Sequence, residues 1–144
     1  MRVLGLDLGA KRIGVAVSDA EGRVATPCDT VHRSGDRQRE HREIEQLIQE
    51  WEAELLVVGM PYSLDGSIGP AAENIESEIH QLRVTISVPI ETYDERLTTV
   101  TANRVLMEMD MRAEERRKVV DKVAASIILQ SWLDAQQAKA QDHG

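Results

Sequence analysis

The hydrophobic positions of the chain fall into short apolar runs separated by polar turns, a pattern typical of β-strands. Residues 3–9 (VLGLDLG) and 12–18 (RIGVAVS) are two such runs joined by a short turn, and they predict a hairpin. A third strand is expected over residues 22–29. The run at residues 55–59 (LLVVG) is apolar throughout, as in a strand that is covered on both faces. A strand near Ile90 brings the predicted number to five.

Apolar residues at helical spacing mark the remaining elements. One helix is predicted over residues 36–51, a second over residues 70–82 with a proline at its first position, and two more toward the C-terminus, the last covering residues 119–135. Residues 136–144 are polar and are expected to form a frayed tail after a single domain of residues 1–135. The order of elements predicts an α/β fold with a mixed five-stranded sheet, three antiparallel strands followed by two parallel ones, flanked by helices.

An aspartate interrupts the first apolar run. Asp7 lies near the C-terminal end of that strand, where burying an unpaired charge costs several kcal/mol or shifts the pKa until the group is neutral. Such a carboxylate usually has a partner, often a metal ion. The alternative is that Asp7 caps the following turn through its own backbone.

A second carboxylate follows a later strand. Glu95 comes directly after the strand near Ile90, before a helical segment that opens around Thr98. Ligands of open α/β sheets bind at the carboxyl ends of strands, so this position favours a functional role. The alternative is an acid in a first helical turn, stabilised by the helix dipole.

A third carboxylate continues an apolar stripe of the last helix. Asp121 precedes Ala125, Ile128 and Trp132 at helical spacing, so it is predicted to face the sheet. The alternative is an N-terminal acid that complements the helix dipole or pairs with Lys118 or Lys122. Three misplaced carboxylates together favour one shared site.

Composition limits the chemistry of that site. The chain has 144 residues, enough for one domain with a core, and no apolar run approaches the ~20 residues of a membrane span. The single cysteine, Cys28, excludes an internal disulfide and fits a reducing cytoplasm, so a cytoplasmic location is expected. The four histidines lack ligand spacing, and a hard, oxygen-bound ion such as Mg²⁺ or Mn²⁺ is the expected metal.

The net charge of −8 argues against a nucleic-acid partner only at first sight. Residues 36–54 hold seven acids against three Lys or Arg, whereas residues 94–122 hold seven of each. If a divalent ion neutralises the three acids, their surroundings become basic and can contact phosphate. The candidate substrate-binding residues are Lys11, Arg12, Arg96, Arg116, Arg117, Lys118 and Lys122. For the run of residues 116–118, a solvated helix start is the alternative.

Four segments carry a resemblance to a known family. They are LDLGAKRIGVAVSD (6–19), VVGMP (57–61) followed by Asp65-Gly66, DERLTT (94–99) and VVDKVAA (119–125). In this order the chain closely resembles the YqgF/RuvX family of the ribonuclease-H-like superfamily, described as Holliday junction resolvases and as nucleases that mature the precursor of 16S ribosomal RNA. Leu8 and Ala10 stand where a proline and a threonine are expected, and both flank Asp7 without removing it.

The resemblance implies that Asp7, Glu95 and Asp121 form a catalytic, metal-binding triad for one or two Mg²⁺ or Mn²⁺ ions. Such a site hydrolyses phosphodiester bonds without a nucleophilic side chain. Lys122 and Arg96, next to the acids, could stabilise the transition state or form ion pairs with the acids themselves.

The family resemblance leaves the substrate open. Processing of the 5′ end of pre-16S ribosomal RNA is the expected role, with resolution of branched DNA as an alternative that needs two sites and hence a homodimer. A non-catalytic RNA-binding or ribosome-binding module is the third possibility. The loop of residues 61–69, which opens a helix, is either a substrate contact or an ordinary connection.

Overall fold

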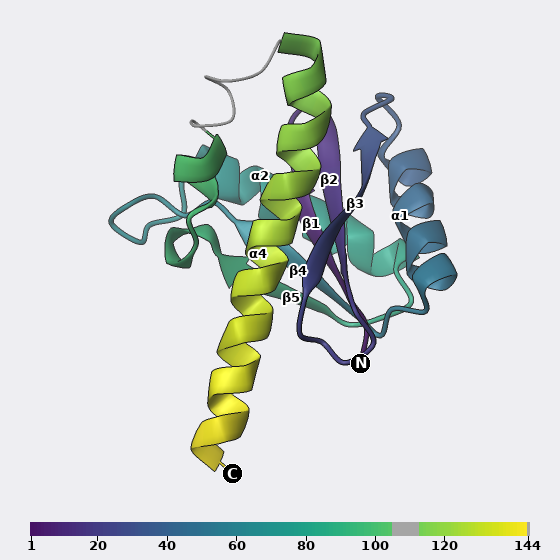
Figure 1. Cartoon of the computed structure of the whole chain (residues 1–144). Helices are drawn as coiled ribbons and strands as arrows, with labels where there is room; N and C mark the ends of the chain where they lie inside the picture. Colours follow the sequence, from purple (N-terminus) through teal and green to yellow (C-terminus); the bar gives the residue numbers. More distant parts are fainter. Residues whose placement is uncertain (105–112, 144) are drawn as a thin grey trace.

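A five-stranded mixed sheet forms the centre of the molecule in this computed structural model (Figure 1). The structure describes the backbone of residues 1–104 and 113–143, and the side chains of residues 1–104 and 119–141. The order across the sheet is β3-β2-β1-β4-β5. The strands are β1 (Val3–Leu8), β2 (Arg12–Ser18), β3 (Ala25–His32), β4 (Leu55–Met60) and β5 (Ile90–Asp94).

The first three strands are antiparallel, as predicted. Asp7 of β1 lies opposite Gly14 of β2, so these two residues point to the same face of the sheet. The predicted bounds of the third strand were wrong, because β3 begins at Ala25 and ends at His32. The side chain of Asp19 accepts hydrogen bonds from the backbone of Arg23 and Val24, which keeps these residues in the turn and delays the strand.

The last two strands are parallel to β1, also as predicted. β1 pairs with β4, and β4 pairs with β5, with Gly59 opposite Tyr93. The carboxyl ends of β1, β4 and β5 therefore meet at one edge of the sheet, together with the end of β3. Asp7 and Glu95 lie at this edge.

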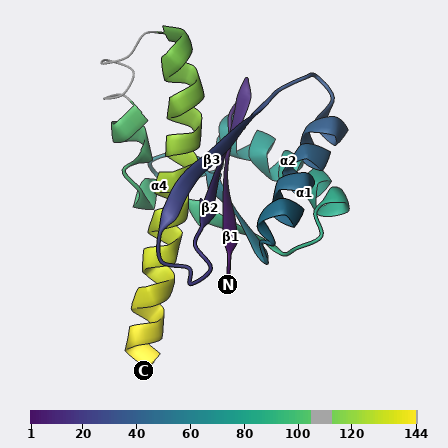
Figure 2. The same cartoon turned by 45° about the vertical axis from the view of Figure 1, so that its right-hand side comes forward.

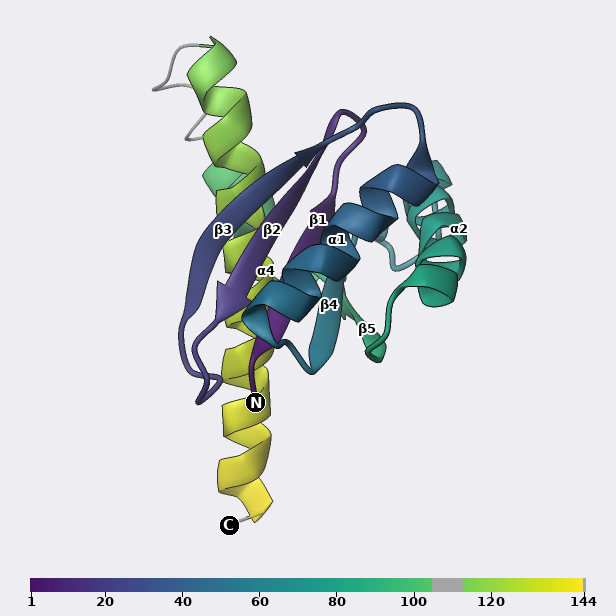
Figure 3. The same ribbon diagram turned by 90° about the vertical axis from the view of Figure 1, so that its right-hand side faces the viewer.

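Helices cover both faces of the sheet. α1 (Arg37–Trp51) and α2 (Pro70–Thr85) lie on one face and α4 (Ala113–His143) on the other, which Figures 2 and 3 show as three layers. Leu4, Leu6 and Leu8 belong to the core beneath α1 and α2. Val3 belongs to the core beneath α4, so alternate residues of β1 serve the two faces.

The bounds of α1 and α2 are close to those predicted, whereas those of α4 differ. α1 begins after Asp36, whose side chain accepts a hydrogen bond from the N–H of Arg39 as an N-cap. α4 begins before the predicted residue 119 and continues to His143, so residues 136–143 are helical and the prediction of a frayed tail was wrong. Alanine, glutamine and lysine are good helix formers, and they extend the packed part of α4 beyond the sheet (Figure 1).

The predicted orientation of α4 is confirmed. Ala125, Ile128 and Trp132, the stripe that Asp121 continues, are buried against the sheet. Another helical segment begins at Val100 and is described as far as residue 104. None of the helices in the described part of the chain is long and apolar enough to cross a membrane.

Candidate active site

Three carboxylates meet near the carboxyl ends of the parallel strands. Asp7 is the next-to-last residue of β1 and is 5% exposed. Glu95 opens the short 3₁₀ helix η1 (Glu95–Leu97) that follows β5 directly. Asp121 lies on α4, which covers the same face of the sheet to which Asp7 points. The three acids that the sequence singles out therefore belong to one region.

Gly14 brings Asp121 close to Asp7. A Cβ atom at residue 14 would lie 1.9 Å from the backbone carbonyl oxygen of Asp121, a distance that no real side chain tolerates. Since Gly14 is the direct ladder partner of Asp7, the backbone of α4 rests on the strand pair at the level of Asp7. A glycine at this position is thus required for the approach of the third acid.

Gly59 likewise permits the close approach of Glu95 to the end of β4. A Cβ atom at residue 59 would lie 2.8 Å from Oε1 of Glu95 and 2.7 Å from Cδ1 of Ile128 on α4. The carboxylate of Glu95 therefore folds back over the end of β4 and under α4. This inward turn explains why Glu95 is only partly exposed although its neighbours Arg96 and Leu97 are exposed.

The charges of the three acids influence one another. Burial raises the pKa of Asp7, and the nearby charge of Asp121 raises it further, while Arg104 opposes both effects. Burial and the charge of Asp7 raise the pKa of Glu95 to about 7, again against the effect of Arg104. Two carboxylic acids with raised pKa values in one pocket are typical of functional sites.

Two arginines neutralise part of this charge. Arg104, from the segment that begins at Val100, forms an ion pair with Oδ2 of Asp7. Arg12, the first residue of β2, donates from Nε to Oδ2 of Asp121 at 2.7 Å. The side chain of Arg104 is 34% exposed, whereas the side chain of Asp7 alone is 8% exposed. Arg104 therefore reaches into the site from its open side.

The donor set suits a hard divalent cation, because all three acids offer oxygen and their mutual repulsion is relieved by positive charge. In the described part of the chain, however, no group of three or more acid, histidine or cysteine side chains stands ready to hold a metal ion. Asp7 and Asp121 are each turned to an arginine instead. A cation would bind Asp7, Glu95 and Asp121 after displacing the guanidinium of Arg104.

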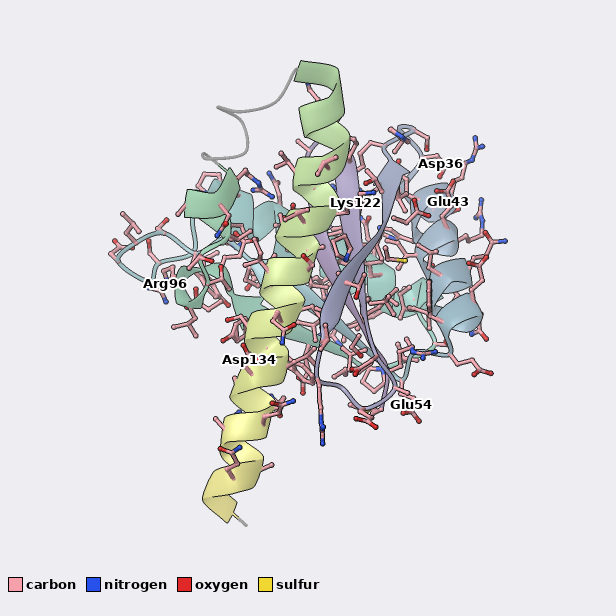
Figure 4. The ribbon with its side chains drawn as sticks, viewed as in Figure 1. Asp36, Glu43, Glu54, Arg96, Lys122 and Asp134 are labelled. Carbon is pink, nitrogen blue, oxygen red and sulfur yellow. The ribbon has the colours of Figure 1, made fainter. Side chains whose placement is uncertain are left out.

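The predicted substrate-binding cations whose side chains the structure describes, Lys11, Arg12, Arg96 and Lys122, are not brought together as one patch. Lys11 is exposed in the turn between β1 and β2, and Arg12 is paired with Asp121. Arg96 is paired with Asp94 at 2.6 Å, and Figure 4 shows it on the opposite side of α4 from Lys122. The side chains of residues 116–118 (Arg116, Arg117 and Lys118) lie outside the described part of the structure.

Arg96 instead fastens the loop that follows β4. Its guanidinium lies 5.7 Å from the centre of the Tyr62 ring and donates to the carbonyl oxygen of Leu64 at 3.5 Å. Asp94 accepts hydrogen bonds from its Nε and Nη2 atoms. Arg96 therefore links the loop of residues 61–69 to the strand end that carries Glu95.

A cavity of about 620 Å³ opens beside the acids at the same edge of the sheet. Asp7, Glu95 and Arg104 line this cavity, together with Arg33, Arg37 and residues from the N-terminal part of α2. Asp7 and Glu95 thus lie at the wall of an open space that is large enough for part of a nucleotide chain.

Comparison with solved structures defines the class of fold. The structure is similar to that of Thermus thermophilus RuvC in complex with a Holliday junction substrate, with a TM-score of 0.60 and 15% sequence identity over 95% of this chain and 96% of that chain. A second structure of Thermus thermophilus RuvC gives a TM-score of 0.57, again at 15% identity. The predicted ribonuclease-H-like fold is confirmed.

Comparison of sequences defines the family within that class. A family model described as RuvX, Holliday junction resolvase, matches residues 1–135, and the chain belongs to this family. A relative from Thermoanaerobacter pseudethanolicus is 42% identical and one from Halalkalibacterium halodurans 45% identical, each over 140 residues that cover 96% of this chain and 100% of the relative. Both relatives bear the name "Putative pre-16S rRNA nuclease".

Two residues of the site were missed by the sequence analysis. Arg104 pairs with a residue 97 positions away, and nothing in its local sequence indicates this contact. Arg33 follows the end of β3 at the edge that carries the acids, but the predicted strand ended at residue 29 and left Arg33 in a loop. Correct bounds for β3 would have placed Arg33 near the site.

Proposed function

We propose that the protein is a metal-dependent nuclease that hydrolyses phosphodiester bonds of structured RNA and processes the 5′ end of pre-16S ribosomal RNA. The observation that carries the proposal is the convergence of Asp7, Glu95 and Asp121, with raised pKa values for the first two, beside an open cavity. The names of the relatives support the choice of RNA substrate.

The proposed roles follow from the charges of the site. Asp7, Glu95 and Asp121 would hold one or two Mg²⁺ or Mn²⁺ ions, which would supply an activated water and positive charge for the phosphoryl oxygens. Arg104, once displaced from Asp7, remains beside the cavity and can pair with a phosphate oxygen of the substrate.

The chain's own side chains set the geometry of this site. Arg12 orients the carboxylate of Asp121 through a single charged hydrogen bond. Glu95 is held by close contact with Gly59, which restricts its carboxylate to the face beneath α4. These contacts fix the directions of Asp121 and Glu95, whereas Asp7 must release Arg104 before it can bind a cation.

Substrate binding is proposed to use the exposed cations around the cavity. Arg37 is exposed and lines the cavity, Lys11 is exposed in the turn next to its lining residues Gly9 and Ala10, and Arg116, Arg117 and Lys118 are proposed as further phosphate contacts. Lys122 and Arg96 are less suited to this role. Burial raises the pKa of the Cys28 thiol, and Lys122 lies close enough to this residue of β3 to oppose the effect. Arg96 is paired with Asp94.

The cellular setting is part of the proposal. We propose a cytoplasmic protein, because its substrate is made there and its single cysteine needs no oxidising compartment. A homodimer is required only if the protein resolves four-way junctions, which need two symmetric cuts. Light scattering of the purified protein determines whether that requirement is met.

The test is cleavage by the purified protein of a 5′-extended 16S precursor and, in parallel, of a four-way DNA junction. We expect the precursor to be cut at its 5′ side in Mg²⁺ or Mn²⁺ and to stay intact with excess EDTA. Cleavage of the junction alone would replace RNA processing by junction resolution. Full activity after exhaustive chelation would exclude the metal mechanism, and binding without cleavage of either substrate would favour a non-catalytic module.

A further inference from the structure

A second cluster of buried charged side chains lies behind the acid site. Glu40 and His41 of α1 and Glu78 of α2 are each 2% exposed, and Arg33 reaches them from the segment after β3. Arg33 donates from Nη1 and Nη2 to the two carboxylate oxygens of Glu78, at 2.6 and 2.8 Å. It also donates from Nη1 to Glu40 at 2.9 Å, and Nε2 of His41 lies 2.8 Å from Glu78.

The cluster is well satisfied electrostatically. Burial alone would raise the pKa of Glu78, but hydrogen bonds from Arg33 and His41 lower it to about 2. The pKa of Glu40 is likewise lowered, against the effect of burial, by Arg33 and by the backbone N–H of Ser34. Both glutamates are therefore charged at neutral pH.

Stability alone is a poor reason for such a cluster. Moving two charged side chains from water into the protein interior costs about as much free energy as their mutual attraction contributes. Replacing a buried ion pair by apolar residues is therefore often neutral or stabilising. An apolar contact between α1, α2 and the sheet would hold the layers together as well. The charged cluster is therefore expected to act through the contacts that Arg33 makes at its exposed end.

At that end Arg33 binds the turn that joins the strand of Asp7 to the strand of Arg12. Its Nε donates to the carbonyl oxygen of Gly9, and its backbone N–H donates to that of Lys11, both at 3.1 Å. The turn follows Leu8, the residue after Asp7, and the N–H of Gly9 donates to the carbonyl oxygen of Asp7 at 3.0 Å. It ends at Arg12, the partner of Asp121.

We propose that Arg33 is a positioning residue for the acid site, with Glu40 and Glu78 as the anchors that hold its guanidinium against the Gly9–Lys11 turn. The proposal rests on the proposed nuclease function. Arg33 fixes the turn, and through it the end of β1 that carries Asp7 and the start of β2 that carries Arg12. Arg33 and Glu78 also line the same cavity as Asp7, so the cluster forms the rear wall of the substrate space.

The first test is Arg33→Lys, with Arg39→Lys on the exposed surface of α1 as the matched control. An ammonium group cannot span both oxygens of Glu78 and still reach Gly9, because it lacks the planar fork of arginine. We expect kcat to fall about 10- to 100-fold while KM changes less than about 3-fold, as for outer residues that orient metal ligands. The control should retain the parental kcat and KM.

A readout independent of activity is amide hydrogen exchange by NMR. In Arg33→Lys, the amides of Gly9 and residue 33 should exchange at least about 10-fold faster, whereas those in the middle of β1 should keep the parental rate. If the parent cuts neither substrate, the proposed function fails, yet the exchange measurement still decides whether Arg33 holds the turn. Unchanged exchange together with an unchanged kcat would overturn the proposal.

A third variant separates positioning from folding. In the triple variant Arg33→Met, Glu40→Met and Glu78→Met, the buried charges are replaced together by apolar side chains of similar length. We expect this variant, once folded, still to show the low kcat and the fast exchange of Gly9. Recovery of parental kcat in the folded triple variant would contradict a positioning role. If the triple variant does not fold, Arg33→Lys alone decides the question.

Discussion

Gly14 packs directly against Asp121, so that a Cβ atom at residue 14 would lie 1.9 Å from the backbone carbonyl oxygen of residue 121. Because Gly14 is also the ladder partner of Asp7, this one contact sets the separation of two acids that come from the first strand and the last helix. The geometry of the proposed catalytic site therefore depends on a residue that has no side chain.

Gly14→Ala should move α4 away from the sheet. We expect a loss of about 3 kcal/mol in the free energy of unfolding, as for overpacking in a rigid core. Cleavage should fall about 100-fold, the usual result of a displacement of about 1 Å among reacting groups. Gly69→Ala is the control, since a Cβ there would meet only the hydroxyl of Ser63 at 3.0 Å. Urea unfolding and initial cleavage rates measure both effects, and parental values for Gly14→Ala would show that α4 can adjust without cost.

Glu95 should make the metal-free protein less stable as pH rises. The folded protein holds the Glu95 proton with a pKa of about 7, while the unfolded chain releases it near the ordinary glutamate pKa of 4.5. The contribution of this group to stability is thus fully present below pH 4.5 and is lost as pH rises through about 7.

Glu95→Gln should remove this dependence. At pH 8 in EDTA, we expect the variant to be more stable than the parent by about 1 kcal/mol, a value reduced for partial exposure to solvent. At pH 4 the two proteins should be equal. The midpoints of urea unfolding at the two pH values measure the difference, with Glu54→Gln on the surface as control. A variant less stable than the parent at pH 8 would contradict the raised pKa.

Arg104 should compete with a divalent cation for Asp7. In Arg104→Gln the carboxylate is free and the repulsion of the cation by the guanidinium is gone, so Mn²⁺ should bind about 3- to 10-fold more tightly. Titration calorimetry with Mn²⁺ measures the affinity, and Arg42→Gln, an exposed change on α1, is the control. Weaker binding by Arg104→Gln would mean that Arg104 organises the ligands instead of occupying their place.

The basic run of residues 116–118 should contribute to substrate affinity through phosphates alone. For the parent we expect a slope of about −2 to −4 for log affinity against log salt on duplex substrate, at about −0.9 for each phosphate contact. Replacing Arg116, Arg117 and Lys118 together by Ala should weaken the binding of substrates of every sequence to the same extent. It should also make the slope less negative by about 1 to 3. The double variant Arg39→Ala and Arg42→Ala is the control. An unchanged slope in the triple variant would make the run a solvated helix start.

Two of the three acids could be singled out because they stand out against a local hydrophobic pattern, whereas Glu95 was marked only by its place at a strand end. Asp7 interrupts an apolar strand, and Asp121 continues a buried stripe at helical spacing, so neighbouring residues suffice to mark both. Their arrangement in one region follows from the parallel pairing of β1, β4 and β5, which the alternation of strands and helices predicts. The close approach at Gly14 was not predictable, since a glycine within a strand does not indicate what packs against it.

The edge strand and the arginines were harder to predict. Half of the residues of β3 are exposed and Pro27 interrupts its pattern, while the pairing with β2 shifts register between Val15 and Ala16. The bounds of β3 therefore depend on its partner and the preceding turn. Arg33 and Arg104 act through contacts with residues 45 and 97 positions away, which local periodicity does not reveal.

We propose that Asp7 is a ligand for the catalytic cation of a nuclease. Comparing Asp7→Asn with Asp134→Asn, two isosteric changes on different parts of the surface and core, distinguishes a ligand from a structural acid. Cleavage of the 5′-extended 16S precursor in Mg²⁺ should fall about 1,000-fold in Asp7→Asn, which loses several kcal/mol of transition-state stabilisation. The free energy of unfolding in EDTA should be equal to that of the parent or higher, because a buried charge with a raised pKa is removed. Asp134→Asn, on the exposed part of α4, should cut at the parental rate. An Asp7→Asn protein that cuts the precursor at a near-parental rate would show that Asp7 is structural and that the acidic site is not the catalytic centre.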